Sequence, residues 1–115
     1  MYNDNLKKAF PAISNQWDHE IIPELEQFIR IPNKSPAFDP DWKANGYMHQ
    51  AMTLIMNWCQ RQPIQNMTME LLEDGDHTPL LWIEIEGQTD DTILLYGHMD
   101  KQPEMKGWDE DKGPW

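Results

Sequence analysis

His98 and Asp100 are the residues of this sequence whose types and spacing point most directly to chemistry. Side chains two residues apart on an extended backbone project to the same side, so the Asp100 carboxylate can accept a hydrogen bond from one nitrogen of the His98 ring. That hydrogen bond fixes the tautomer of the imidazole, raises its basicity and leaves the other nitrogen available to a metal ion. We therefore interpret His98 as a candidate metal ligand and Asp100 as a candidate catalytic residue that orients it.

The position of this pair along the chain matters, because a His-x-Asp triplet also occurs as an ordinary hydrogen bond in a loop. His98 directly follows Gly97, which ends a nearly continuous apolar run over residues 92–96. Such a run predicts a strand that is covered on both faces, as in the centre of an α/β sheet. Ligands and catalytic groups gather beyond the carboxyl ends of such strands, so the position favours a functional site.

Two helices are predicted ahead of this strand. Apolar residues recur at helical spacing over residues 13–29. Pro23 lies inside this stripe, where it removes a backbone hydrogen bond, and it predicts a kink or a division near residues 19–22. A second, methionine-rich stripe over residues 48–59 predicts a helix with one core-facing side. Cys59 belongs to that side, and we interpret it as a buried core residue and not as a reactive thiol.

The apolar period changes after Pro63 from about 3.6 to 2, which is the period of a β-strand. Alternation predicts strands over residues 67–71 and 80–86, and the apolar run over residues 92–96 is the third strand. The expected fold class is therefore α/β. Two amino-terminal helices are followed by three strands that form part of a mixed, mostly parallel sheet.

Composition and charge exclude several classes of protein. The 115 residues include 20 acidic residues against 9 Lys and Arg, for a formal net charge of −11. This balance leaves no basic patch for nucleic acid or for an anionic membrane. The sequence has no signal-like amino terminus and no run of about 18 apolar residues, so we expect a cytoplasmic protein with neither kind of partner. A single cysteine permits no intramolecular disulfide, and the histidines other than His98 are interpreted as surface or packing residues: His19, His49 and His77.

The string LLYGHMDKQP over residues 94–103 resembles the segment around the first metal ligand in carnosinase-like dipeptidases, as do Gly107-Trp108 and Gly113-Pro114-Trp115. These enzymes belong to the family of co-catalytic zinc metallopeptidases that includes acetylornithine deacetylase and succinyl-diaminopimelate desuccinylase. The order of a helix ending over residues 28–32, a second helix and then strands is similar to the amino-terminal region of that family.

The resemblance implies that His98 is a ligand of one of two zinc ions and that Asp100 orients it. Zinc in such enzymes polarises the scissile carbonyl and lowers the pKa of a bound water to about 7. The implied substrate is a dipeptide, a short peptide or an N-acyl amino acid that is cut at an amide bond. The family's bridging aspartate, its general-base glutamate and its other ligands match no residue of this chain.

Residues 1–115 are accordingly expected to be the amino-terminal part of a metallopeptidase catalytic domain. The remainder of that domain and the lid or dimerisation domain are absent from the sequence. We expect this segment to be inactive by itself and to bind no zinc tightly. We also expect exposed apolar residues and an unpaired sheet edge, with self-association into a homo-oligomer as the outcome.

Two other interpretations remain open. The chain could belong to a family member that has lost catalysis and acts as a binding or scaffold protein. It could also be a complete small α/β domain in which the His-x-Asp triplet is structural. The coding sequence beyond Trp115 separates the family readings from the last one, because the family places its remaining ligands there.

Overall fold

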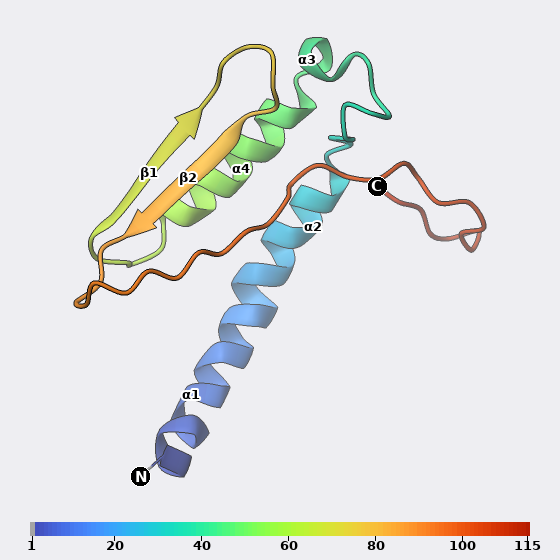
Figure 1. The fold of residues 1–115 in the computed structure, drawn as a ribbon. Helices are drawn as coiled ribbons and strands as arrows, with labels where there is room; N and C mark the ends of the chain where they lie inside the picture. The colour runs from blue at the N-terminus through green and yellow to red at the C-terminus, as the bar shows by residue number, and fades with distance from the viewer. Residues whose placement is uncertain (1) are drawn as a thin grey trace.

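The computed structural model describes residues 2–115 as a chain of mixed helix and strand (Figure 1). The amino-terminal half is helical and is followed by a β-hairpin and a long extended tail. In order, the elements are α1 (Tyr2–Gln16), the π-helical turn η1 (Trp17–Ile21), α2 (Ile22–Arg30), α3 (Trp42–Asn45), α4 (Tyr47–Gln60), β1 (Met67–Leu72) and β2 (Leu80–Ile85).

A single long rod is formed by α1, η1 and α2 (Figure 1). The helix begins at Tyr2 and not near Ile13, because the apolar spacing continues toward the amino terminus through Phe10 and Leu6. Much of the rod's apolar stripe is uncovered, and its exposed members include Phe10, Ile13 and Trp17. The rod therefore presents an apolar face that the rest of the described chain does not cover.

The predicted kink or division near residues 19–22 takes the form of an irregular turn inside a continuous helix: a π-helical turn at Trp17–Ile21, just before Pro23. Pro23 has no backbone N–H to donate to the carbonyl of His19, and its ring crowds that carbonyl. A π-helical turn widens the helix by one residue and absorbs this conflict without ending the rod. Pro23 then occupies the first turn of α2, where its missing N–H costs nothing.

The core is small and lies where α2 and the following loop meet α4. The methionine-rich stripe faces inward as predicted, with Met48, Ala51 and Met52 fully buried. Ile31, just after α2, is buried beside them. Cys59 is half-buried near the end of the same stripe, and burial raises the pKa of its thiol, which disfavours a reactive thiolate as expected.

The two strands form an antiparallel hairpin. Its register pairs Met67 with Ile85, Met69 with Ile83 and Leu71 with Leu81, so these six apolar residues share one face. The other face is mixed and includes Trp82 opposite Glu70. The hairpin lies along α4 in Figure 1, and His49 of α4 contacts Glu73 after β1 at 3.2 Å. The predicted alternation in these two segments is thus confirmed.

The third predicted strand is not formed, and the expectation of a three-stranded, mostly parallel sheet is wrong for residues 2–115. Their sheet has two antiparallel strands, and residues 92–96 are extended without strand pairing. Ile93, Leu94, Leu95 and Tyr96 are 77–88% exposed. An apolar run becomes a strand only when a neighbouring strand accepts and donates its backbone hydrogen bonds, and residues 92–96 pair with neither outer edge of the hairpin.

The described chain is expanded for its length. Its radius of gyration is 17.7 Å, whereas a compact domain of this length has about 13 Å. Its accessible surface is 9753 Å², against roughly 6,600 Å² for a compact monomer of the same mass. None of the helices in residues 2–115 is both long and apolar enough to cross a lipid bilayer. Exposed apolar residues of the rod, such as Phe10, and of the extended tail, such as Leu95, contribute to this surface.

Replacing Met52 by Ala tests whether the contact between α2 and α4 is the core. Because Met52 is 3% exposed, we expect Met52→Ala to lower the free energy of unfolding by about 2–5 kcal/mol. Urea titration followed by far-ultraviolet circular dichroism measures this change. Thr53→Ala, on the exposed side of the same helix, is the control and should change it by less than about 0.5 kcal/mol. Equal losses in the two variants would show that the core lies elsewhere.

The exposed apolar run predicts concentration-dependent self-association. Leu95→Lys should reduce it, because a charged side chain in the middle of an unpaired apolar strand opposes edge-to-edge pairing. The new lysine lowers the net negative charge, so weaker association cannot be ascribed to added repulsion. Sedimentation velocity at increasing concentrations measures the effect, with Thr89→Lys as the control outside the run. A purely monomeric wild type would contradict the prediction.

Candidate functional site

The structure brings His98 and Asp100 together as their spacing predicts. The Nδ1 atom of His98 lies 3.1 Å from Oδ1 of Asp100 and 3.0 Å from the Asp100 carbonyl oxygen. Both oxygens are acceptors, so the ring nitrogen between them carries a proton, and in the neutral ring this leaves the lone pair on Nε2. The His98 side chain is 64% exposed and that of Asp100 is 30% exposed. The pair thus leaves one imidazole nitrogen open to a ligand.

Hydrogen bonds to the loop after α2 hold the backbone around Asp100. The amide of Lys101 donates to the carbonyl of Asn33 at 2.9 Å, and the amide of Ser35 donates to the carbonyl of Lys101 at 2.9 Å. The side-chain amide of Asn33 donates to the carbonyl of Met99 at 3.0 Å. Figure 1 shows the extended tail reaching the carboxyl end of α2 at this point.

The ammonium group of Lys101 lies at the carboxyl end of α2. It donates to the carbonyls of Phe28 at 2.7 Å and of Ile31 at 2.6 Å, and also to Oδ1 of Asn33. The Phe28 ring lies 3.9 Å from the same nitrogen, within the range of a cation–π contact. Burial lowers the pKa of Lys101 to about 8, and the group is mostly charged at pH 7. A cation here complements the helix dipole and is a second donor to two carbonyls that each already accept a backbone amide.

Asn33 joins these contacts and is 1% exposed. Its oxygen accepts from Lys101 and its nitrogen donates to Met99, so both polar ends of the buried side chain have partners. Sequence reasoning missed Asn33 because it belongs to no periodic stripe or local motif. Lys101 lies inside the string over residues 94–103, but no contact of its side chain could be predicted from that string. The available signal was a polar residue directly after Ile31-Pro32, at the end of an amphipathic helix, where a lysine can donate to backbone carbonyls.

The other histidines have structural contacts, as expected. His77 and Asp74 form a turn in which the backbone amide of His77 donates to Oδ1 of Asp74 at 2.9 Å and the ring nitrogen lies 2.6 Å from Oδ2. The amide and ring of His77 lower the pKa of Asp74 to about 2. His19 contacts the carbonyl of Asn15 within the rod at 3.0 Å.

The donor set fits one zinc ligand and no complete zinc site. Zinc accepts a neutral imidazole nitrogen, and a carboxylate on the opposite ring nitrogen is the usual partner of such a ligand. Within residues 2–115, no group of three or more His, Cys, Asp or Glu side chains could hold a metal ion. The described residues therefore supply His98 as a ligand and Asp100 as its hydrogen-bond partner, and nothing further toward a metal.

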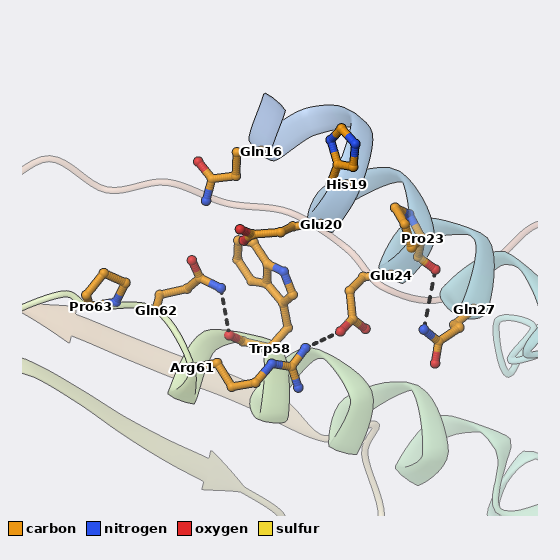
Figure 2. A pocket seen from close by; sticks show the side chains of 10 residues that line it. All are labelled: Gln16, His19, Glu20, Pro23, Glu24, Gln27, Trp58, Arg61, Gln62 and Pro63. Atoms are coloured by element: carbon orange, nitrogen blue, oxygen red, sulfur yellow. Dashed lines mark hydrogen bonds and ion pairs between the residues drawn. The ribbon is translucent and has the colours of Figure 1, made fainter. Parts of the chain in front are cut away.

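A cleft of the described chain lies away from this pair. It measures about 570 Å³ and opens between the rod and the end of α4 (Figure 2). Arg61 crosses it to pair with Glu24, and Gln62 donates to the carbonyl of Trp58 at 3.1 Å. The lining residues are Gln16, His19, Glu20, Pro23, Glu24, Gln27, Trp58, Arg61, Gln62 and Pro63. The Arg61 guanidinium in this cleft is paired with the Glu24 carboxylate. Among the lining residues, no unpaired guanidinium or ammonium group is therefore available to a peptide carboxylate.

No family model matches this chain, and no curated protein matches it. The resemblance of residues 94–103 to zinc peptidases accordingly stays a prediction from the residues themselves.

The burial of Lys101 predicts a titration distinct from that of the other lysines. Its side chain should titrate with a midpoint near pH 8, and not at the ordinary value of 10.5, when followed by the ¹³Cε chemical shift. The unfolded chain binds more protons than the folded chain between these two pH values. The free energy of unfolding of the wild type should therefore rise with pH across this window relative to Lys101→Met. A midpoint near 10.5, or a difference that falls with pH, would contradict the structure.

Proposed function

We propose that this chain is the amino-terminal part of the catalytic domain of a zinc-dependent hydrolase of the carnosinase-like dipeptidase and acetylornithine deacetylase family. The substrate class is a dipeptide, a short peptide or an N-acyl amino acid, cut at an amide bond. The observation that carries the proposal is the His98–Asp100 hydrogen bond inside the string over residues 94–103. Its geometry is the one that a zinc-binding histidine and its orienting carboxylate require.

In this proposal each residue of the pair has one role. His98 offers Nε2 to zinc, and Asp100 accepts the Nδ1 proton, which fixes the tautomer and makes the ring a better ligand. Bound zinc would polarise the amide carbonyl and activate a water molecule. The exposed imidazole is accessible to such an ion without rearrangement of the loop. One ligand is too few for catalysis, so the two zinc ions of the family need residues from outside this chain.

The uncovered apolar surface also supports assignment to a larger domain. Leu94, Leu95 and Tyr96 directly precede the candidate ligand and are almost fully exposed. Monomeric proteins seldom expose contiguous apolar runs of this kind, whereas a catalytic domain would cover them with neighbouring chain. The lone, half-buried Cys59 suits a reducing compartment, and we propose a cytoplasmic enzyme.

A structural role for the pair is the alternative with its own support. His77 with Asp74, and His49 with Glu73, are also close histidine–carboxylate contacts, and neither lies near other metal-binding side chains. A third such pair could equally be a loop contact. The two readings differ in whether substitution of His98 removes a metal.

The decisive experiment uses the product of the whole coding sequence. We expect it to contain zinc by plasma mass spectrometry and to hydrolyse members of a panel of dipeptides and N-acyl amino acids. His98→Ala should lose bound zinc and activity, and Asp100→Asn should lower kcat/KM by about 10- to 100-fold. His77→Ala, which removes a histidine–carboxylate pair elsewhere, should leave both unchanged.

Residues 1–115 alone should bind no zinc stoichiometrically. A single imidazole with a neighbouring carboxylate is too small a ligand set for tight binding. A submicromolar 1:1 zinc site in a calorimetric titration of this segment would contradict the proposal. A whole protein that contains zinc but keeps it after His98→Ala would support the structural reading of the pair.

A further inference from the structure

We propose that Lys101 and Asn33 are positioning residues for the His98–Asp100 pair, which they hold at the carboxyl end of α2. We call their hydrogen bonds to one another, to Met99 and to the carbonyls of Phe28 and Ile31 the Asn33–Lys101 cluster. The inference rests on the proposed function for its catalytic consequence, but the positioning itself is a property of this chain.

The cluster fixes the backbone on both sides of Asp100. On one side, the carbonyl of Met99 accepts from the Asn33 side chain. On the other side, the amide and the carbonyl of Lys101 are both hydrogen-bonded to the loop after α2. With both neighbours held, Asp100 has little freedom to turn away from His98. The carboxylate and the carbonyl that face the imidazole are thereby placed by residues some 66 positions earlier in the sequence.

The chain before the pair provides no comparable support. Residues 87–98 make no backbone–backbone hydrogen bond to any part of the described chain. Their apolar side chains are exposed, as at Leu95 and Tyr96. Residues 87–98 do not hold His98 in place. Without the Asn33–Lys101 cluster, the backbone at residues 99–101 would lose the side-chain contacts that hold it on the other side. The cluster is thus the contact through which the described structure orients the candidate ligand.

Lys101 itself is not placed to bind substrate. Its ammonium has three hydrogen atoms to donate, and the structure gives it three oxygen acceptors: two backbone carbonyls and Oδ1 of Asn33. The Phe28 ring covers another side. Its neighbour in the parallel bridge, Lys34, differs: the ammonium of Lys34 lies 3.3 Å from the Glu104 carboxylate in a partly exposed ion pair and makes no hydrogen bond to the end of α2 in the described chain. Lys34 is therefore the matched control lysine.

The first test measures the pair directly in this chain. In the wild type we expect ring ¹⁵N chemical shifts of His98 that report one dominant Nδ1–H tautomer, and high {¹H}–¹⁵N NOE values at residues 99–101. Lys101→Met, which keeps length but removes the cation, should give averaged tautomer shifts and reduced NOE values there. Lys34→Met should match the wild type, because its single, partly exposed ion pair with Glu104 contributes little order. Unchanged His98 ring shifts and NOE values in Lys101→Met would overturn the proposal.

A second variant separates loss of positioning from unfolding of the Lys101→Met protein. Asn33→Asp preserves shape and the acceptor for Lys101 but replaces the donor to Met99 by an oxygen that repels its carbonyl. We expect the helical circular dichroism to be retained while the NOE value at Met99 falls and the His98 tautomer shifts average. If Asn33→Asp leaves both signals at wild-type values, the cluster does not position the pair.

The catalytic consequence is measured on the product of the whole coding sequence at saturating zinc. Lys101→Met should lower kcat by about 10- to 100-fold, because misplacement of an active-site group by about 1 Å has effects of this size. KM should change less than about twofold, because Lys101 does not contact substrate. A raised KM with unchanged kcat would contradict a positioning role. A wild type that contains no zinc and shows no activity would contradict the proposed function only. The positioning of the pair is tested separately, by the ¹⁵N chemical shifts of the His98 ring in this chain.

Discussion

The hydrogen bonds of the Lys101 ammonium at the carboxyl end of α2 connect parts of the chain that would otherwise be independent. On one side lies the helical core of α2 and α4, and on the other lies the extended tail that carries His98. The carbonyls of Phe28 and Ile31 each accept one backbone amide, and the lysine from the tail is a second donor to both, while buried Asn33 completes the contact. Asn33 is 1% exposed, so loss of Lys101 would leave the buried Oδ1 of Asn33 without this donor, which is more costly than loss of an exposed ion pair. The position of the candidate site follows from this contact.

The small core of the described chain explains why the placement of the extended tail depends on the Lys101 contact. The buried apolar core comprises Ile31, Met48, Ala51 and Met52, and the hairpin adds an apolar face whose residues are at most half-buried. The amino-terminal rod extends beyond this core with its stripe uncovered. These features suit a segment that packs against further protein, and they agree with the proposal that the zinc hydrolase site is completed by other residues. Under this proposal the described chain contributes one metal ligand, its orienting carboxylate and the Asn33–Lys101 cluster that holds them.

Local features were predictable from sequence and distant polar contacts were not. The π-helical turn before Pro23 follows from a missing N–H, and the inward face of α4 follows from the spacing of Met48 and Met52. The approach of Asp100 to His98 follows from an i, i+2 spacing. By contrast, the contact between Asn33 and Lys101 joins residues 68 positions apart, and no periodicity encodes it. The apolar run over residues 92–96 was misread as a formed strand because hydrophobicity reports a tendency to be covered and does not supply the neighbouring strand.

Anomalous diffraction at the zinc edge, from crystals of the product of the whole coding sequence, tests the central claim most directly. The account predicts a zinc peak about 2.0–2.1 Å from Nε2 of His98, with Asp100 still hydrogen-bonded to Nδ1. Zinc bound elsewhere in the protein, with both nitrogens of the His98 ring free of metal, would contradict it.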